Sequence, residues 1–348
     1  MRITFLGDVF LQEDTDWRSG LPKELQGDAL VLNFEYVYDD GTLGDKDAAE
    51  GKINLKGRGN PFRNFQGCKV ACLANNHSLD YSDTGCVSTI GFLDSHSVQS
   101  VGLWHDGKRN AFAKISDKIS VSAYLHGHMR RSSNSQANWR EEVVDEGMIV
   151  EDGRIAKAAG VEFHVVYLHW GSEFMPVPWP NQVALAHRLV DSGAVDMVIG
   201  MHPHCRQPWE KYKGKYIFYS LGNSVFAHYR NMPSFFKGGV AQAKWAEHWG
   251  PESNTSYAVT MDVEDLCVHV WTCCYDGEEL KVLSCDETAG DLQVTRMRCG
   301  IAVFRRIKLG WRSFLHGKAS LALWHLRAAI RSYKSFMRTV AGISRGCK

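Results

Sequence analysis

The feature that most constrains the fold of this 348-residue chain is a series of short apolar runs, each followed by polar side chains. Runs of this length that are rich in Val, Ile and Leu predict buried strands. The runs cover residues 3–6, 30–32, 70–74, 162–168, 196–199 and 217–220. The polar residues that follow them, in the same order, are Asp8, Glu35, Asn76 with His77, His169, His202 with His204, and Asn223.

Two helical stretches separate these predicted strands. Residues 84–95 and 181–192 have helical spacing of apolar residues, and Gly193 provides a stop for the second. Alternation of strands and helices predicts an α/β fold. Ligands of such sheets bind outside the carboxyl ends of the strands. We therefore expect the polar residues to gather at one edge.

The run at 195–204 ends in Gly200-Met201-His202-Pro203-His204. Pro203 limits the backbone between the two histidines, so both imidazoles can be held in one cleft. Neutral imidazole is a common ligand of zinc, manganese and iron. The alternative is a loop with two surface histidines, but the similar ends of the other runs favour a metal site.

The residue types at the strand ends are those of a two-metal centre: carboxylates, an amide and several imidazoles. Two neighbouring cations need a bridging carboxylate, which Glu35 or Asp8 could supply, and together they can activate water against a phosphoryl group. His77 could protonate a leaving oxygen, with Asp80 orienting it. Glu173 is a candidate hydrogen-bond partner behind the ligand His169. These donors suit Mn, Fe or Zn.

Seven motifs give the chain a specific resemblance to a known family. They are Phe5-Leu-Gly-Asp-Val9, Asn33-Phe-Glu35, Leu73-Ala-Asn-Asn-His-Ser-Leu-Asp-Tyr81, His169-Trp-Gly-Ser-Glu173, Val198-Ile-Gly-Met-His-Pro-His204, Gln207-Pro208 and Tyr219-Ser-Leu-Gly-Asn223. In this order they resemble the CapA, or poly-gamma-glutamate capsule-biosynthesis, family, which belongs to the calcineurin-like metallophosphoesterase superfamily. The resemblance covers most of residues 1 to about 282.

The resemblance implies a four-layer αββα sandwich with divalent metal ions, two of them, at one sheet edge. It implies one ion held by Asp8, Glu35 and His204, another held by Glu35, Asn76, His169 and His202, and His77 as the acid. Three positions depart from the superfamily pattern: Phe10 and Met201 stand where histidines are usual, and Glu35 replaces an aspartate. We expect the first ion to bind more weakly, or only together with substrate.

The end of the chain has a different composition. No acidic residue follows Asp291, and basic residues alternate with aromatic and aliphatic ones from Arg305 onward. We predict a metallophosphoesterase-like domain at 1–300 and a basic amphipathic helical tail at 301–348. The tail could pack on the domain, or contact a membrane surface or an anionic polymer. The net charge of +1 gives no reason to expect nucleic acid as a partner.

Three further expectations concern less regular stretches. Residues 105–158 have no readable motif and are expected to contain a lid, with a polar loop at 130–138; within them 119–124 is strand-like, and His126 and His128 only imitate a metal motif. Residues 257–282 alternate in polarity and predict a hairpin or meander. Ten cysteines without disulfide spacing, and the lack of a leader-like start, favour the cytoplasm, at the inner membrane face if the tail contacts lipid.

Three functions fit the sequence. The leading hypothesis is a metal-dependent hydrolase of a phosphoester in capsule or cell-envelope polymer biosynthesis. The second is a non-hydrolytic accessory protein that binds an anionic polymer, such as poly-gamma-glutamate or a phosphorylated glycan, during capsule assembly. The third is a hydrolase or transferase acting on an amide of a glutamyl polymer.

Overall fold

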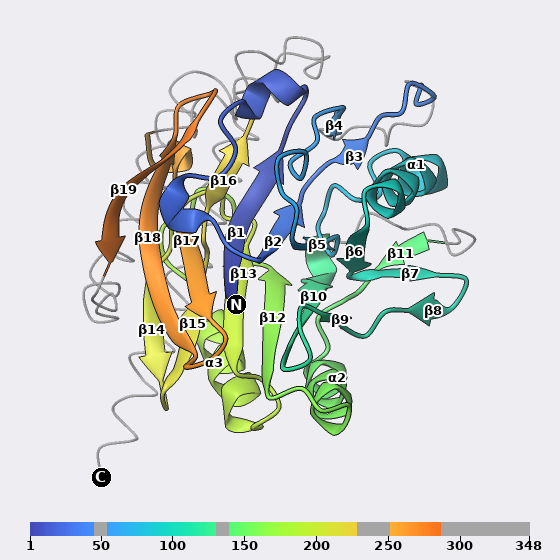
Figure 1. Ribbon diagram of the computed structural model, residues 1–348. Helices are drawn as coiled ribbons and strands as arrows, with labels where there is room; N and C mark the ends of the chain where they lie inside the picture. The colour runs from blue at the N-terminus through green and yellow to red at the C-terminus, as the bar shows by residue number, and fades with distance from the viewer. Residues whose placement is uncertain (45–53, 130–138, 228–250, 287–348) are drawn as a thin grey trace, which may run out of the picture.

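The computed structural model describes residues 1–44, 54–129, 139–227 and 251–286, and two β-sheets form its centre (Figure 1). The first sheet has eight strands in the order β19-β18-β17-β1-β2-β5-β6, with β16 also pairing with β1. Its strands are β1 (Arg2–Phe10), β2 (Ala29–Phe34), β5 (Cys68–Cys72), β6 (Val98–Val101), β16 (Asn223–Phe226), β17 (Thr255–Asp262), β18 (Cys267–Tyr275) and β19 (Leu280–Asp286).

The second sheet has six strands in the order β14-β15-β13-β12-β10-β9. They are β9 (Ala113–Lys114), β10 (Ile119–Leu125), β12 (Phe163–His169), β13 (Met197–Met201), β14 (Trp209–Tyr212) and β15 (Lys215–Phe218). Two small sheets complete the described part, one of β11 (Trp139–Glu141), β7 (Leu103–His105) and β8 (Lys108–Arg109), the other of β3 (Val37–Tyr38) and β4 (Lys56–Gly57).

The helices lie on the outer faces of the two large sheets (Figure 1). They are α1 (Ser82–Ser95), α2 (Glu146–Ala158) and α3 (Pro180–Asp191). One apolar core fills the space between the sheets, a second lies between the first sheet and α1, and a third lies between the second sheet and α2 with α3. The layers therefore follow the order αββα, which confirms the predicted fold class.

Strand β12 shows how the sequence produces these layers. Side chains alternate between the two faces of a strand, so Phe163, Val165 and Tyr167 enter the core between the sheets. Val166 and Leu168 point the other way, into the core beneath the helices. A strand covered on both faces needs a nearly continuous apolar run, which explains the 162–168 stretch.

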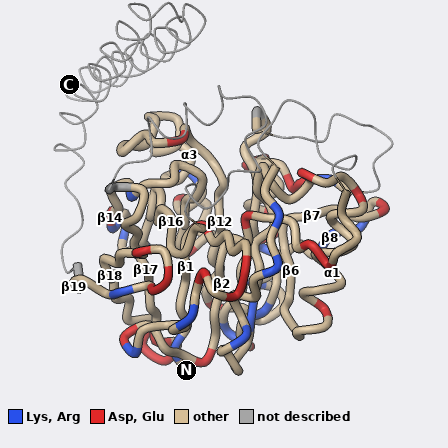
Figure 2. Tube along the Cα trace, turned by 90° about the horizontal axis from the view of Figure 1, so that it is seen from above, with Lys and Arg blue, Asp and Glu red and all other residues tan. Residues whose placement is uncertain are grey.

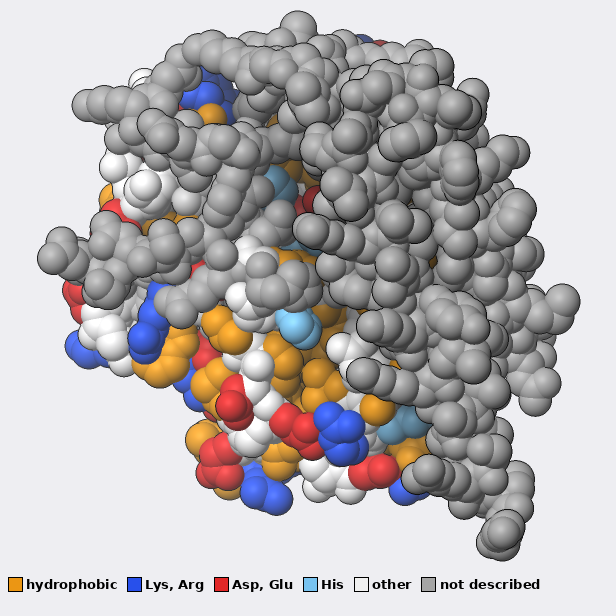
Figure 3. Space-filling model, turned by 180° about the vertical axis from the view of Figure 1, so that it is seen from behind, with side chains coloured by type: hydrophobic (Ala, Val, Ile, Leu, Met, Phe, Trp, Pro, Cys, Tyr) orange, Lys and Arg blue, Asp and Glu red, His pale blue; other side chains and the backbone are white. Residues whose placement is uncertain are grey.

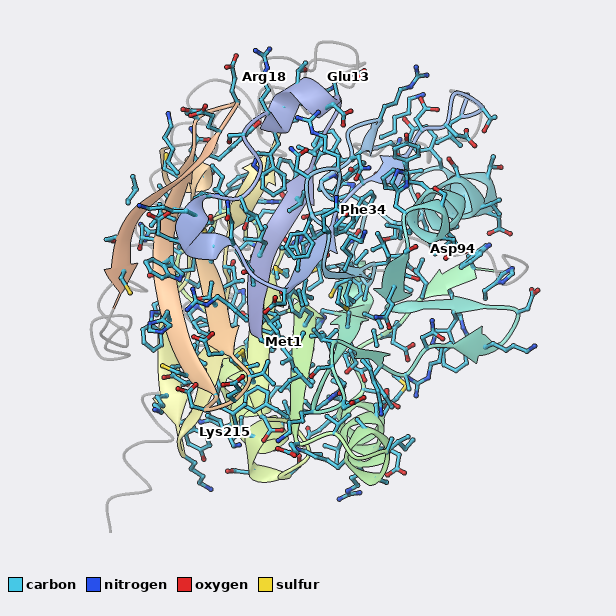
Figure 4. The ribbon with its side chains drawn as sticks, in the orientation of Figure 1. Met1, Glu13, Arg18, Phe34, Asp94 and Lys215 are labelled. Carbon is cyan, nitrogen blue, oxygen red and sulfur yellow. The ribbon has the colours of Figure 1, made fainter. Side chains whose placement is uncertain are left out.

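The parallel strands of both sheets have their carboxyl ends at the same end of the molecule. In Figure 4, Met1 and Lys215 lie near the starts of β1 and β15, and Glu13, beyond the end of β1, lies at the opposite end. Figure 4 also places Phe34 between the first sheet and α1, where it lies 6.2 Å from the ring of Phe92. Acidic and basic residues are interspersed around the described trace (Figure 2), in keeping with the small net charge.

Several boundaries differ from the predictions. β1 does not end before Asp8 but continues to Phe10, and its pairing with β2 shifts register between Phe5 and Asp8. The described part of the stretch expected as a lid is largely regular structure, since it contains β8 to β11 and α2. The meander predicted near the end is confirmed as β17, β18 and β19.

Some predicted features lie outside the described residues. These are the polar loop at 130–138, the domain boundary at residue 300 and the basic tail at 301–348. Within the described ranges, every helix is too short or too polar for a bilayer crossing.

Candidate metal centre

The polar residues predicted at the strand ends come together at the carboxyl edge of the two sheets. Asp8 lies within β1, Glu35 follows β2, and Asn76 with His77 follows β5. His169 is the last residue of β12, and His202 with His204 follows β13. All of them are buried, and Asp8, Glu35 and His204 are fully so. Histidine and acidic side chains are visible on the face of the molecule seen from behind (Figure 3).

Two groups of possible ligand atoms share Glu35. One group is Asp8, Glu35 and His204, and the other is Glu35, His169 and His202; within each group the atoms lie within 4.8 Å of one another. Glu35 Oε1 is 3.7 Å from Nε2 of both His169 and His204. Asp8 Oδ2 is 3.6 Å from His204 Nδ1. Glu35 therefore lies between two groups of donors, as a bridging carboxylate would.

The loop after β5 brings an amide and a fourth imidazole. Asn76 Oδ1 is 2.7 Å from His169 Nε2, so the amide oxygen lies beside the second group. His77 Nδ1 is 2.7 Å from Asp80 Oδ2, the contact that the three-residue spacing predicts. The Leu55 N–H also donates to Asp80 Oδ2, at 2.6 Å, and this bond holds the carboxylate in place.

Two asparagines without a predicted role support the site. Asn33 Nδ2 donates to Asp8 Oδ1 at 2.8 Å and lies 3.3 Å from Glu35 Oε2. Asn223 Oδ1 is 2.8 Å from His204 Nδ1, and Asn223 faces Asp8 in the pairing of β1 with β16. The available signals were the position of Asn33 two residues before Glu35 and that of Asn223 at the end of a predicted strand.

The backbone around the two histidines of the His-Pro-His loop is unusual. His202 has φ of 90° and His204 has φ of 52°, values that residues other than glycine seldom adopt and that cluster at functional sites. The N–H of His202 donates to Asp8 Oδ2 at 3.2 Å, which ties this loop to β1. Gly200 is required nearby, because a Cβ there would lie 1.9 Å from the Tyr219 carbonyl oxygen.

Burial determines the electrostatics of the site. It raises the pKa of Asp8, and burial together with the Asp8 carboxylate raises the pKa of Glu35 well above its usual value. Burial and the neighbouring imidazoles of His202 and His204 hold the pKa of His169 well below its usual value. His169 is therefore neutral at physiological pH, which is the form that binds a cation.

The donor set fits divalent cations. Glu35 Oε1 is buried, and no group of the described residues donates a hydrogen bond to it. No lysine or arginine in that part of the chain forms an ion pair with Asp8 or Glu35. Buried charges are normally paired or coordinate a metal, so two such carboxylates among imidazoles indicate a place for cations. Mixed nitrogen and oxygen donors do not distinguish manganese, iron and zinc.

Two of the three departures from the expected pattern, at Phe10 and Met201, have clear structural consequences. Phe10 is fully buried and packs edge-on against Tyr36 and Phe226, so an apolar contact occupies the position of an imidazole. Met201 belongs to the core between the sheets. Glu173, expected behind His169, instead forms a third group of possible ligands, with His202 and His204.

The chain is similar to several known bacterial proteins. A family model described as "Bacterial capsule synthesis protein PGA_cap" matches residues 2–228. The capsule biosynthesis protein CapA of Bacillus anthracis is 30% identical over 249 residues, which are 65% of this chain and 60% of that protein. A probable polyglutamine synthesis accessory protein of Mycobacterium tuberculosis is 31% identical over 177 residues, 45% of this chain and 44% of that protein. The chain thus spans about half the length of these curated relatives.

Two solved structures were also similar. The calcineurin-like phosphoesterase YfkN of Bacillus subtilis is 13% identical with a TM-score of 0.43, covering 86% of this chain and 97% of that one. The sulfate thiohydrolase SoxB of Thermus thermophilus is 10% identical with a TM-score of 0.37, covering 81% of this chain and 58% of that one.

Proposed function

The chain belongs to the bacterial capsule synthesis protein family PGA_cap, and from this premise we propose that it is a metal-dependent hydrolase of a phosphoester. Its substrate would be a phosphoester of a capsule or cell-envelope polymer or of a precursor of one. The observation that carries the proposal is the shared position of Glu35 between two groups of buried donors. A hydrolase that acts through two cations needs this arrangement.

Each part of the site has a task in such a reaction. Asp8, Glu35 and His204 would hold one cation, and Glu35, Asn76, His169 and His202 the other. When bound, the cations would lower the pKa of a water molecule and offset the charge on the phosphoryl oxygens. The amide of Asn33 donates to Asp8 and lies close to Glu35. These contacts fix the positions of both carboxylates.

In this proposal His77 would transfer a proton to the leaving group. Its Nδ1 faces Asp80, and a carboxylate in this position stabilises the imidazolium form and fixes the ring orientation. The proton at Nε2 can then pass to the leaving oxygen, a step that contributes about 10²–10⁴-fold in comparable enzymes. Burial of His77 keeps this proton from being shared with bulk water.

A second function is favoured by Phe10. Because an apolar contact replaces one imidazole, the site could hold a cation that binds an anionic polymer without cleaving it. The relative of Mycobacterium tuberculosis is named an accessory protein. In this alternative the chain binds poly-gamma-glutamate or a phosphorylated glycan through the bound cation during assembly of the polymer.

The test measures metal content and turnover of a phosphomonoester and a phosphodiester of p-nitrophenol with Mn²⁺, Fe²⁺ or Zn²⁺. We expect bound metal and turnover in the wild type, and at least a 10²-fold loss of turnover in His77→Ala. His202→Ala and Asn76→Ala should lose both metal and turnover. The matched control is His96→Ala, since His96 is exposed and lies at the end of α1, before β6 begins.

The outcomes separate the two functions. Bound metal without turnover of either ester, combined with metal-dependent retention on poly-gamma-glutamate, would support the accessory role and reject the hydrolase. Turnover that persists in His202→Ala would show that the activity comes from elsewhere.

A further inference from the structure

We propose that Glu173 is a direct ligand of the cation beside Asp8 and supplies the donor that Phe10 cannot. The inference deepens the proposed function, and it depends on cation binding at the site but not on hydrolysis. It changes the expectation drawn from sequence spacing, in which Glu173 supported His169 from behind.

Glu173 lies close to both histidines of the His-Pro-His loop. A carboxylate oxygen of Glu173 lies within 4.8 Å of ring nitrogens of both His202 and His204. His204 also belongs to the group of Asp8 and Glu35, and His202 belongs to the group of His169. Glu173 is therefore near both groups of donors. It is partly exposed, unlike Asp8 and Glu35, so it approaches from the solvent side.

Hydrogen bonds hold the loop that carries Glu173 against the His-Pro-His loop. The Trp170 N–H donates to Met201 O, at the end of β13, at 3.1 Å, and the Phe174 N–H donates to Pro203 O at 2.7 Å. Gln207 Nε2 donates to Met175 O at 2.8 Å. Phe174 has φ of 58°, an unfavourable conformation for a phenylalanine. Strain of this kind persists only where the surroundings enforce it, which is common at ligand sites.

The number of donors to the cation beside Asp8 also favours Glu173 as a ligand. The first group offers two carboxylates and one imidazole, because Phe10 is enclosed by Tyr36 and Phe226 where a further imidazole would stand. Manganese and iron accept more than three protein donors. Glu173 shares His204 with this group, so a cation bound by both would have four donors, and Asp8, Glu35 and Glu173 would place three negative charges beside two divalent cations.

The electrostatic field is consistent with this reading. The carboxylates of Asp8, Glu35 and Glu173 belong to two groups of possible ligands that share His204. In a site without cations these like charges repel one another. A cation held by Asp8, Glu35, His204 and Glu173 would offset that repulsion.

The experiment compares Glu173→Gln with the wild type by calorimetric titration with Mn²⁺ and by electron paramagnetic resonance of the bound ion. Glutamine keeps the shape of the side chain and removes its charge. We expect one of two Mn²⁺ sites to weaken about ten- to hundredfold, the scale on which residues around a bound metal affect its affinity. The control is Glu162→Gln, an exposed change at the opposite end of β12, which should leave both sites unaltered.

The results distinguish this inference from the proposed function. If Glu173→Gln binds Mn²⁺ like the wild type while turnover is present, Glu173 is not a ligand and the hydrolase stands. If it weakens one site while the wild type hydrolyses no ester, Glu173 is a ligand and the hydrolase falls. A wild type that binds no cation overturns both. Unchanged circular dichroism and thermal midpoint in both variants exclude a folding defect.

Discussion

Asp152 on α2 and the acids at the ends of β1 and β2 are buried to a similar degree, but among the described residues only Asp152 has a basic side chain beside it. Asp152, on α2, receives hydrogen bonds of 2.6 Å from both terminal nitrogens of Arg109 and one of 2.6 Å from the Tyr124 hydroxyl. Asp8 and Glu35 face imidazoles and amides instead. Within the described ranges the fold neutralises Asp152 by itself, and the proposed cations would neutralise Asp8 and Glu35.

Another buried acid, Asp196, shows how basic neighbours change the pKa of a carboxyl group. Burial raises the pKa of Asp196, but hydrogen bonds from Lys157 and Lys215 and from the His164 N–H outweigh it and leave the pKa below its usual value. The pKa of Glu35 moves in the opposite direction. The depth of an acid therefore does not indicate a functional site by itself; what matters is whether the fold supplies a cation.

The largest expected effect comes from removing the internal cation. Arg109→Met leaves Asp152 buried and uncompensated, and breaking a buried ion pair in this way costs about 3–5 kcal/mol of unfolding free energy. Urea unfolding followed by circular dichroism at neutral pH would measure it. Lys118→Met is the matched control, because its pair with Glu162 is exposed and should be worth at most about 1 kcal/mol. Equal losses in the two variants would contradict the comparison.

The next effect is smaller and depends on an added cation. A ligand present at about 100 times its dissociation constant stabilises the folded state by about 2.7 kcal/mol. We expect Mn²⁺ to raise the unfolding free energy of the wild type by that order and to raise that of Glu35→Gln by much less. In the presence of a chelator Glu35→Gln should be at least as stable as the wild type, since it loses a buried charge beside Asp8. Thermal unfolding with and without Mn²⁺ tests both statements.

The opposite result would be informative. If Glu35→Gln kept the full response to Mn²⁺, the cation would bind elsewhere on the protein. If the variant were strongly destabilised in chelator, the Glu35 carboxylate would have a structural partner, and the contrast with Asp152 would not hold.

Much of the site could be predicted because its residues follow continuous apolar runs. Parallel strands covered on both faces must be apolar along their length, so the first polar residue after each run indicates the edge where ligands bind. Asp8, His169 and His202 were found in this way. Asn223 escaped assignment because β16 returns to pair with β1 from more than 200 residues away, and nothing in the local sequence gives that pairing.

The region around α2 was interpreted less well for a physical reason. Ser120 and Ser122 interrupt the apolar pattern of β10, yet both are buried, and their hydroxyls lie 2.8 and 2.9 Å from the two ring nitrogens of His164. Burial lowers the pKa of His164 to about 4, so the ring stays neutral within this cluster. The strand predicted at 119–124 is confirmed by β10, whereas the lid was expected because residues 105–158 have no readable motif.

The smallest effect is expected at Glu142, a buried acid that has a basic neighbour but shares it with Asp152. Glu142 is buried 3.5 Å from Arg109, but Arg109 is already committed to Asp152. Burial raises the pKa of Glu142 to about 7, and the charge of Arg109 offsets this only in part. Between about pH 4.5 and 7 the folded protein therefore binds more protons at this position than the unfolded chain. Stability from this group is present at low pH and is lost as the pH rises through that window.

Glu142→Gln has no such titration. The wild type should therefore lose stability relative to the variant between pH 5 and pH 8, by about 1 kcal/mol or more, since a shift of one pKa unit corresponds to about 1.4 kcal/mol. Urea unfolding of both proteins at several pH values, in chelator so that the metal centre does not contribute, measures the difference. Parallel curves would mean that Arg109 pairs with Glu142 and Asp152 equally well, and that one internal cation is enough for two buried acids.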